Sequence, residues 1–373
     1  MPRKPSGNPT IADVARECGV GAMTVSRVVN GGKLVSAAKV ARVRAAIAKL
    51  GYEPNEAARI LKGQVPRTIG LIVPDLADPF FSTCAHAVQR MAAKHGYTTL
   101  LLASERNRAR EAKELLIMKS RNIAGILIVP TDAACIAQLQ DLRARDVPVV
   151  MLDRTFPGLD AGEVTVENEE GTRAAVNHLV EHGHRSILCV GYDRQFNSIA
   201  QRISGYEKAM NDAGLKPQFL IVEGDSTLGS RVLRRLQSAK PPTALFALNN
   251  VATTRILHVL LRENIQVPYE VAIIGFDDFE LAPLLAVPLT AVRQPAAELG
   301  RSATRMLLQW IRSGASGVRS ASLQVVLPTE LIIRRSCGCG PERKIGLDGR
   351  QSISSAPASA EEPIPFPSVS RSL

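Results

Sequence analysis

The sequence predicts a small all-α unit at the amino terminus, followed by a large α/β region built on parallel sheets. A chain of 373 residues is too long for one typical core, so at least two domains are expected. Residues 10–50 show the apolar spacing of short amphipathic helices. From residue 68 onward, short apolar runs alternate with helical patterns, which is typical of parallel sheets covered by helices on both faces.

Residues 10–30 predict two short helices joined by a tight turn. Thr10 is suited to cap the first helix, and Gly19 follows that helix as a left-handed stop. The second helix starts near Ala22 and buries its valines. The residues left on or near its outer surface are Met23, Thr24, Ser26, Arg27 and Asn30. A helix-turn-helix places such a second helix in the major groove of DNA. An ordinary helical hairpin with a polar face is the alternative.

The chain that follows predicts a third helix over Leu34–Leu50, which closes a three-helix core. Residues 51–55 break this helix, and residues 56–63 form a segment too short to be a stable helix alone. Residues 1–62 hold eleven Lys and Arg against four Asp and Glu, within a chain of formal net charge +11. A basic small domain on a nearly neutral body suits a polyanionic partner.

The α/β region contains eight predicted strands, a number that suits two open sheets. The strands are Ile69–Val73, Thr98–Leu102, Gly125–Val129, Val149–Leu152, Ser186–Val190, Phe219–Val222, Ala244–Ala247 and Val271–Gly275. The helical patterns between them are Ser82–His95, Glu111–Arg121, Gly171–Glu181, Ala200–Ala213, Leu228–Gln237 and Ala252–Arg262. Ligand sites gather at the carboxyl ends of parallel strands, and several strands here are followed by polar groups such as Asp153, Asn249 and Asp277.

Other features point away from membranes, metals and catalysis. The basic amino terminus lacks an apolar segment behind it, and no stretch reaches the ~18 apolar residues of a membrane span, so we expect a cytoplasmic protein without a membrane partner. Four of the six cysteines lie in apolar runs, whereas Cys337-Gly338-Cys339 is expected to be an exposed, functionally neutral pair. His178–His182 matches a zinc-peptidase spelling, but we interpret it as the end of a helix. We expect no cofactor, metal or activated nucleophile.

Several linked motifs occur in register over residues 10–62. They are T-I-x-D-V-A, G-V, M-T-V-S-R-V-x-N, L-G-Y-x-P-N and A-R-x-L-K. Together they resemble the lactose-repressor (LacI/GalR) family of bacterial transcription regulators, and the resemblance continues to about Ser336. It implies a two-lobed α/β core like that of periplasmic sugar-binding proteins. Crossings between the lobes are expected near Val164–Asn168, Thr290–Gln294 and Leu327–Thr329, and helix Ala296–Trp310 would complete the first lobe.

The resemblance also implies a division of the chain into four parts. A helix-turn-helix domain would cover residues 8–54, a hinge helix and linker residues 55–66, the two-lobed effector-binding and dimerisation core residues 67–336, and a disordered tail residues 337–373. The tail has no leucine heptad that would join two dimers, so a homodimer is expected. The Ser-, Pro- and Ala-rich composition of residues 341–373 is typical of disorder.

Residues that would hold a small-molecule effector are carried over from the same resemblance. They are Phe80, Phe81, Asp153, Arg202, Asn249 and Asp277. Carboxylates accept hydrogen bonds from hydroxyls, Arg donates two in parallel, and aromatic rings supply apolar faces, so a sugar-like effector is expected. The alternatives are lobe core for the two Phe, a loop cap for Asp277 and an interlobe salt bridge for Arg202. Two departures from relatives, Ser226 and Asn250, remove an aromatic and a carboxylate that usually occupy these places.

The predicted function is that of a repressor whose dimer binds a near-palindromic DNA operator under effector control. The residues predicted to contact DNA are Thr10, Ala22, Met23, Thr24, Ser26, Arg27, Asn30, Leu61 and Lys62. Ala22 and Met23 would meet thymine methyl groups. The hinge would fold only on the operator, where Leu61 wedges into the minor groove. Additional phosphate contacts are expected from Arg3, Lys4, Lys33 and Lys39. The alternatives are a cytoplasmic small-molecule-binding protein without DNA function, and a sugar-processing enzyme.

Overall fold

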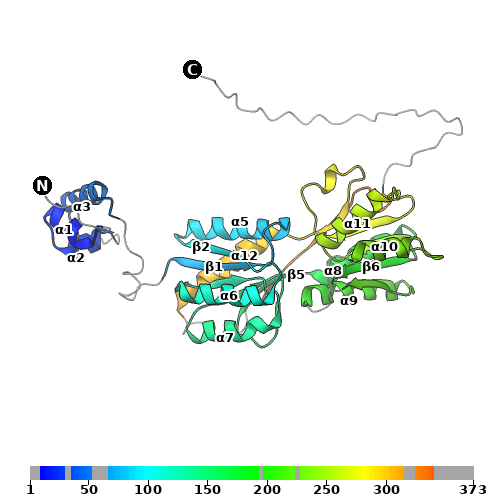
Figure 1. Ribbon diagram of the computed structural model, residues 1–373, viewed down its shortest axis with the longest axis horizontal. Coiled ribbons are helices and arrows are strands. Elements are labelled where there is room, and N and C mark those ends of the chain that lie inside the picture. The colour runs from blue at the N-terminus through cyan, green and yellow to red at the C-terminus, as the bar shows by residue number, and fades with distance from the viewer. Residues whose placement is uncertain are drawn as a thin grey trace, which may run out of the picture.

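The computed structural model describes residues 9–29, 35–52, 66–192, 196–222, 227–314 and 324–339. Three short helices come first, and two α/β lobes follow, which lie side by side in Figure 1. The predicted hinge over residues 55–63 lies outside the described residues. The same holds for Arg3, Lys4, Asn30, Lys33, Leu61, Lys62 and Ser226.

The amino-terminal unit consists of α1 (Ile11–Cys18), α2 (Ala22–Val29) and α3 (Ala37–Leu50). Thr10 and Asp13 form a capping box at the start of α1, and Gly19 ends α1 with a φ of +62°. The helices bury one common cluster, which contains Val14, Ala15, Cys18, Val25, Val43 and Ala46. The prediction that the third helix begins at Leu34 was wrong: it begins at Ala37, because Ser36 is extended and forms the N-cap.

The first lobe is a six-stranded parallel sheet with the order β11-β5-β4-β3-β1-β2. Its strands are β1 (Thr68–Val73), β2 (Thr98–Ala103), β3 (Ile126–Ile128), β4 (Val149–Leu152), β5 (Gly162–Val166) and β11 (Gln324–Leu327). Its helices are α5 (Pro79–Lys94), α6 (Arg108–Ser120), η1 (Ala133–Cys135), α7 (Ile136–Ala144) and α12 (Ala296–Ser313). Helices α5 and α12 pack on one face of the sheet, whereas α6 and α7 pack on the other.

The second lobe repeats this architecture with the sheet order β12-β10-β9-β8-β6-β7. Its strands are β6 (Ile187–Tyr192), β7 (Gln218–Val222), β8 (Ala244–Ala247), β9 (Ala272–Phe276), β10 (Thr290–Arg293) and β12 (Glu330–Ile332). Its helices are α8 (Asn168–Glu181), α9 (Asn197–Asp212), α10 (Leu228–Leu236), α11 (Asn250–Arg262) and η2 (Ala282–Leu284). Only β12 pairs antiparallel, against β10, within the strands described. Helices α8 and α9 cover one face and α10 and α11 the other.

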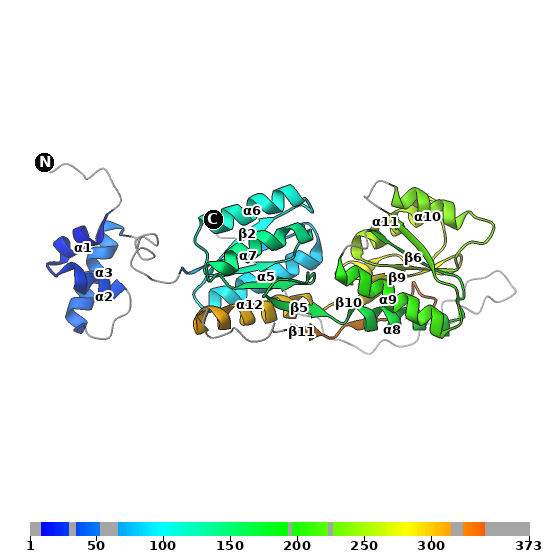
Figure 2. The same ribbon diagram turned by 90° about the horizontal axis from the view of Figure 1, so that it is seen from below.

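The chain passes between the lobes at three places, which lie together in Figure 2. It leaves the first lobe after β5, returns between β10 and α12, and crosses again at residues 328–329 between β11 and β12. Each lobe is therefore assembled from distant parts of the chain, as α12 packing against α5 illustrates. No helix in the described part of the chain combines the length and apolar character that crossing a lipid bilayer requires.

Candidate DNA-binding and effector sites

The outer face of α2 carries the side chains that the sequence singled out for DNA contact. Met23 is 69% exposed, and Ala22 and Arg27 are also exposed, whereas Thr24 and Ser26 are half-buried. Val25 is fully buried and holds α2 against α1 and α3. The helix therefore presents a mixed apolar and cationic ridge on a fixed frame. Such a ridge is the form of a recognition helix that enters a major groove.

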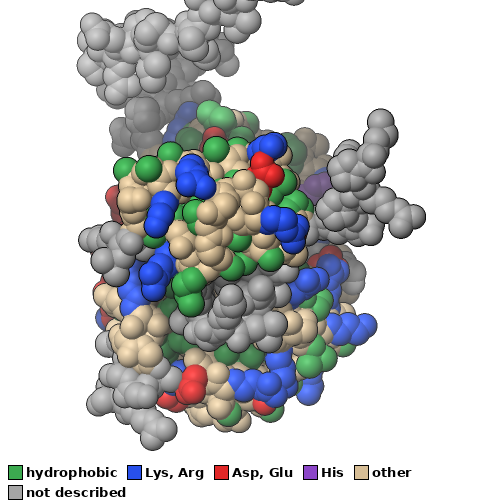
Figure 3. Space-filling view, turned by 90° about the vertical axis from the view of Figure 1, so that its left-hand side faces the viewer, with side chains coloured by type: hydrophobic (Ala, Val, Ile, Leu, Met, Phe, Trp, Pro, Cys, Tyr) green, Lys and Arg blue, Asp and Glu red, His purple; other side chains and the backbone are tan. Residues whose placement is uncertain are grey.

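The amino-terminal unit carries several basic side chains. In the view of Figure 3, Lys and Arg side chains predominate over Asp and Glu on the face turned to the viewer. Arg16 and Lys49 pair with acidic neighbours in their own unit. Arg27 and Lys39, by contrast, make no ion pair with any residue that the structure describes. Their charges are free to neutralise phosphates. Thr10 is exposed, but its hydroxyl already serves the capping box.

A cavity of about 470 Å³ lies between the two lobes. All six residues predicted to hold an effector line it, namely Phe80, Phe81, Asp153, Arg202, Asn249 and Asp277. The first lobe contributes the turn after β1 and the end of β4, and the second contributes α9 and the ends of β8 and β9. The carboxyl ends of parallel strands from both sheets therefore face one another across the cavity, as expected for α/β ligand sites.

Arg202 lies at the centre of the cavity wall and is only 3% exposed. Its Nε donates to Asn168 Oδ1 at 2.8 Å, and its Nη1 donates to the carbonyl oxygen of Leu248 at 2.8 Å. Its guanidinium nitrogens lie 3.9 Å from carboxylate oxygens of Asp153 in one lobe and of Asp277 in the other. Arg202 is therefore placed both to form a salt bridge between the lobes and to contact a ligand in the cavity.

Asp153 and Asp277 occupy equivalent positions at the ends of β4 and β9. Both have left-handed backbones, with φ values of +59° and +76°, which Asp tolerates better than most residues. Each backbone amide donates to the neighbouring strand, Asp153 to the carbonyl of Val164 in β5 at 3.0 Å and Asp277 to the carbonyl of Val292 in β10 at 2.9 Å. Backbones of this kind cluster at ligand sites, where surrounding structure holds a side chain in a fixed direction.

The two carboxylates differ in what they already bind. Both oxygens of Asp277 accept hydrogen bonds, one from Gln294 Nε2 and the other from the amide of Asn250 at 3.2 Å. Oδ1 of Asp153 is buried and has no hydrogen-bond partner in the described part of the chain. Burial is the largest influence on Asp153 and raises the pKa of its carboxyl, although Arg154 and Arg202 oppose it. A buried acceptor without a donor is costly, so this oxygen is suited to receive a donor from a ligand.

A direct hydrogen bond joins the two lobes beside the cavity. Asn250 at the start of α11 donates through Nδ2 to Oδ1 of Asp78 at 2.6 Å. Asp78 is the N-cap of α5 and also accepts from the amide of Phe80 at 3.0 Å. Burial, and then the negative charge of Asp277, raise the pKa of the Asp78 carboxyl. Asn250 therefore donates a hydrogen bond to the Asp78 carboxylate. An Asp at position 250 would instead place a second carboxylate against it.

This contact gives a prediction for Asn250→Asp. The new carboxylate would meet Asp78, and two charges about 3 Å apart repel by about 5 kcal/mol at an effective dielectric constant of about 20. The apo protein should open, with a larger radius of gyration in small-angle X-ray scattering at neutral pH. Asn250→Ala, which removes the bond without adding charge, should open it less. Equal scattering from both variants would show that charge at this position does not control opening.

Aromatic rings and a second guanidinium form the apolar side of the cavity. Phe80 and Phe81 pack edge to face with ring centroids 5.1 Å apart, and Phe81 is also buried in the core of the first lobe. The guanidinium carbon of Arg154 lies 3.9 Å from the ring centroid of Phe196. These surfaces suit the apolar face of a ring, and the polar groups suit its hydroxyls.

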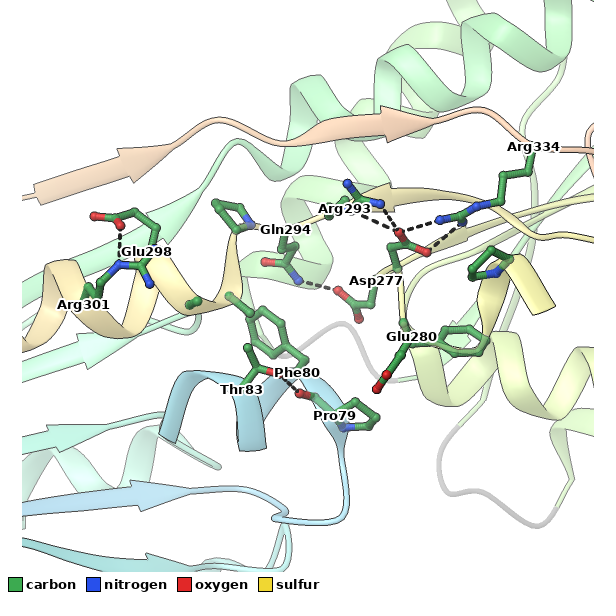
Figure 4. A pocket seen from close by; sticks show the side chains of 16 residues that line it. Pro79, Phe80, Thr83, Asp277, Glu280, Arg293, Gln294, Glu298, Arg301 and Arg334 are labelled. Carbon is green, nitrogen blue, oxygen red and sulfur yellow. Dashed lines mark hydrogen bonds and ion pairs between the residues drawn. The ribbon is translucent and has the colours of Figure 1, made fainter. Parts of the chain in front are cut away.

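A second cavity, of about 580 Å³, adjoins the first at Phe80, Asp277 and Gln294 and is shown in Figure 4. In Figure 4, Gln294 and Asp277 point toward one another, while Arg293 and Arg334 extend from the crossing strands. Both arginines bond to Asp278, with Nη2 to Oδ2 distances of 2.8 and 2.9 Å. In this second cavity Asp278 is already paired with Arg293 and Arg334, and Glu298 is paired with Arg301.

Comparison with known proteins places the chain in a family. Residues 10–55 match the bacterial regulatory proteins of the lacI family, and residues 176–337 match the periplasmic binding protein-like domain. Over 88% of its length the chain is 33% identical to the HTH-type transcriptional repressor CytR of Escherichia coli (strain K12), of which 96% is covered. The protein belongs to the LacI family of bacterial transcription regulators. It is a DNA-binding regulator that responds to a small molecule.

Further relatives agree with this assignment. The chain is 31% identical to the HTH-type transcriptional repressor PurR of Photobacterium profundum over 88% of its own length and 98% of that repressor. The lac repressor dimer bound to operator and the anti-inducer ONPF matches with a TM-score of 0.78 and 25% identity, over 89% of this chain and 99% of that one. These relatives are regulators of transcription and not enzymes.

Further residues that line the cavity of this LacI-family regulator were absent from the predicted effector set. Asp78, Arg154, Phe196 and Gln294 are among them. Asp78 and Arg154 lie next to predicted residues after β1 and β4. Their position in the sequence could therefore have indicated that they line the cavity. Phe196 and Gln294 come from a loop before α9 and from a crossing segment, and nothing in the local pattern distinguishes them.

Proposed function

We propose that the protein is a repressor whose dimer binds a near-palindromic operator, and that a sugar-like molecule in the interlobe cavity controls this binding. The single observation that supports effector control best is the buried cluster of Arg202, Asp153 and Asp277, which draws on both lobes. A ligand that pairs with these groups binds the two lobes together. A change in lobe angle would reach the DNA-binding unit through the hinge over residues 55–63. A coupling of ~1–3 kcal/mol would alter operator affinity ~5–150-fold.

The chemistry of the cavity supports a polyhydroxylated ring as effector. Asp153 Oδ1 offers an unused acceptor, and the neighbouring arginines offer donors. A carboxylate can accept hydrogen bonds from two sugar hydroxyls. A guanidinium can donate two parallel hydrogen bonds to sugar oxygens. Phe80 from the first lobe and Phe196 from the second also line this cavity and supply apolar contact. No catalytic step is proposed for these carboxylates, and the protein is proposed to act in the cytoplasm, where its DNA lies.

The proposed dimer is expected from the two-fold symmetry of a palindromic operator. Exposed apolar surface on the second lobe also supports it. A two-fold protein meets two half-sites of a palindrome, so each recognition helix contacts one of them. Beside α11 lies an apolar depression of about 340 Å³, lined by residues that include Leu257, Leu261 and Leu285. Leu261 is 80% exposed and Leu284 is 76% exposed. Apolar surface of this kind supports contact with a second copy.

The experiment that tests this function starts from selection of genomic DNA fragments by the purified full-length protein. Selected fragments should share a near-palindrome, and fluorescence anisotropy should show specific binding at least ~1000-fold tighter than binding to random duplex. A panel of sugars and sugar derivatives is then screened for a change in operator affinity. A protein that prefers no fragment over random duplex, with or without the panel, would contradict the proposal.

Exchange of the two exposed residues at the start of α2 tests which side chains contact bases. The double variant Ala22→Met with Met23→Ala should prefer a different half-site, because each base contact contributes about 1–3 kcal/mol of discrimination. Selection from a randomised half-site library measures the preference. The control is Ala48→Met on the exposed side of α3, which adds the same side chain away from α2 and should leave the preference unchanged. An unchanged half-site in the double variant would place base contact elsewhere.

A further inference from the structure

Four side chains with metal-binding atoms converge at the carboxyl end of α8. His178 and His182 lie one helical turn apart, and Cys337 and Cys339 come from the segment after β12. Sγ of Cys337 and Sγ of Cys339 each lie 3.3 Å from Nε2 of His178, and Sγ of Cys339 lies 2.8 Å from Nε2 of His182. The ligand atoms of His178, His182 and Cys339 all lie within 4.8 Å of one another.

These separations match the edges of a tetrahedral zinc site. Zinc lies about 2.3 Å from sulfur and about 2.0–2.1 Å from imidazole nitrogen, which places neighbouring sulfur and nitrogen ligands about 3.5 Å apart. Three separations between a thiol sulfur and an imidazole nitrogen here are 2.8, 3.3 and 3.3 Å, and the ligand atoms of His178, His182 and Cys339 form the mutually close group. An ion fits among these three atoms once the shortest separation widens by about 0.7 Å. Cys337, whose sulfur contacts His178, has to shift further to become the fourth ligand.

Neighbouring hydrogen bonds already orient the ligands toward a common centre. Nδ1 of His182 lies 2.8 Å from the carbonyl oxygen of His178, which only accepts, so Nδ1 carries the proton and Nε2 presents its lone pair. The hydroxyl of Thr290 donates to Sγ of Cys337 at 3.1 Å and accepts from the amide of Arg334 at 2.9 Å. Metal-binding histidines and thiolates are supported by second contacts of these kinds.

The backbone of the carboxyl-terminal segment directs both thiols to the same side. Ser336 fixes the segment to the second sheet, because its Oγ donates to the carbonyl of Ile273 at 2.6 Å and accepts from the amide of Thr290 at 2.8 Å. Gly338 then takes a φ of +95°, which side chains rarely adopt. The turn at this glycine lets Cys337 enter the core, where it is fully buried, while Cys339 reaches His182 at the surface.

The expectation that both cysteines are exposed was wrong, because Cys337 is fully buried and Cys339 is half-buried. We propose that His178, His182, Cys337 and Cys339 form a binding site for Zn²⁺ that ties the carboxyl-terminal segment to α8. Two imidazoles and two thiolates are the donor set that zinc takes in structural sites. With four protein ligands the ion has no open position, so the site stabilises the second lobe rather than activating water.

Metal titration of the full-length, fully reduced protein tests the site. Wild type should bind one equivalent of Zn²⁺ in competition with a chromogenic chelator of micromolar affinity, and its melting temperature should rise on addition of Zn²⁺. His182→Gln and Cys339→Ser should each weaken binding at least ~100-fold; both residues lie at or near the surface, so both variants should fold. The control is His184→Gln, which removes a neighbouring imidazole that bonds to Thr243 instead and should leave binding unchanged.

Cobalt provides a second readout that reports the ligands themselves. Co²⁺ bound to wild type should show the strong visible bands of tetrahedral coordination and a thiolate charge-transfer band in the near ultraviolet, and the charge-transfer band should fall by about half in Cys339→Ser. The proposal is overturned if reduced wild type binds no Zn²⁺ at equimolar concentration. It is equally overturned if His182→Gln and Cys339→Ser bind as wild type does, or if the cobalt spectrum lacks sulfur coordination.

Discussion

Asp153→Asn is expected to weaken effector binding about 100-fold and to leave effector-free operator binding unchanged. The carboxylate is buried, and its Oδ1 has no hydrogen-bond partner among the residues that the structure describes, so we expect a ligand donor to supply that contact. Hydrogen bonds to charged groups contribute about 1.5–3 kcal/mol each, which corresponds to roughly 10–150-fold in affinity per bond. Isothermal titration calorimetry with the sugar that changes operator affinity in wild type measures the loss.

The substitution is chosen so that the fold survives it. Asp153 has a φ of +59°, a conformation that Asn tolerates and Ala does not, and the amide bond to Val164 is kept. Burial raises the pKa of this carboxyl, so the desolvation of its charge offsets part of what its ion pairs with Arg154 and Arg202 contribute to the folded state. Asp277 is a less selective target, because both of its oxygens already hold protein groups.

The matched control is Asp160→Asn, an exposed carboxylate of the same lobe that pairs with Arg143. It should bind effector and operator as wild type does. Unchanged effector affinity in Asp153→Asn would show that the cavity carboxylate does not hold the ligand. A variant that also lost operator binding in the absence of effector would show that Asp153 supports the repressor conformation itself.

Most helices of both lobes were predictable, but the first turns of several were not. Apolar spacing places the start of α5 at Ser82, of α6 at Glu111 and of α11 at Ala252, whereas each helix begins two or three residues earlier. Asp78, Asn107 and Asn249 are the N-caps, and their side chains bond to amides of the first turn. Polar residues that appear to belong to loops are in fact the caps that start these helices.

Four strands were not identified as strands because they are short or lie near sheet edges. Strands β5, β10, β11 and β12 fall at or beside the predicted crossings, and β11 has no buried residue among its four. Their pairing depends on residues distant in the chain, as in the contact of β11 with β5. Helix α7 was missed as well, since its apolar residues show little helical period. Long-range pairing of this kind leaves no local pattern in the sequence.

In the candidate site, too, the sequence predicted residues at strand ends but not the contacts between residues far apart in the chain. The six residues carried over by resemblance all line the cavity, because each lies at or near the end of a strand or the start of a helix. The contact of Asn250 with Asp78 joins residues 172 positions apart, and the burial of Cys337 depends on Ser336 reaching β9. Neither contact is visible in the sequence, where the cysteines stand beside a Ser- and Pro-rich tail.

Asp278→Asn is expected to destabilise the second lobe by about 2–3 kcal/mol at neutral pH. The carboxylate is 6% exposed and joins Arg293 of β10 to Arg334 after β12, so it holds the crossing strands to the sheet. Breaking a buried ion pair costs about 3–5 kcal/mol of folding free energy. We expect a smaller loss here because Arg293 is half exposed and the new Asn keeps one hydrogen-bond acceptor. Hydrogen–deuterium exchange of peptides covering β10 and β12 should be faster in the variant.

The pH dependence of this effect has a defined sign. Burial alone would raise the pKa of Asp278, but the hydrogen bonds and charges of Arg334 and Arg293 outweigh it and hold the pKa below its ordinary value. The carboxylate therefore stabilises the folded state at pH values above its unfolded pKa of about 3.9. This contribution disappears as the pH falls through the lower folded pKa, because the folded carboxyl then also binds a proton.

The difference between wild type and Asp278→Asn should therefore be constant from about pH 7 to pH 5 and shrink below about pH 4. Urea unfolding followed by circular dichroism at several pH values measures it. Asp160→Asn is again the control, since an ion pair with an exposed carboxylate contributes about 0–1 kcal/mol and should change little at any pH. A difference that grew toward acid pH would mean that the Asp278 carboxyl is protonated in the folded lobe. The two arginines would then not be what anchors the crossing strands.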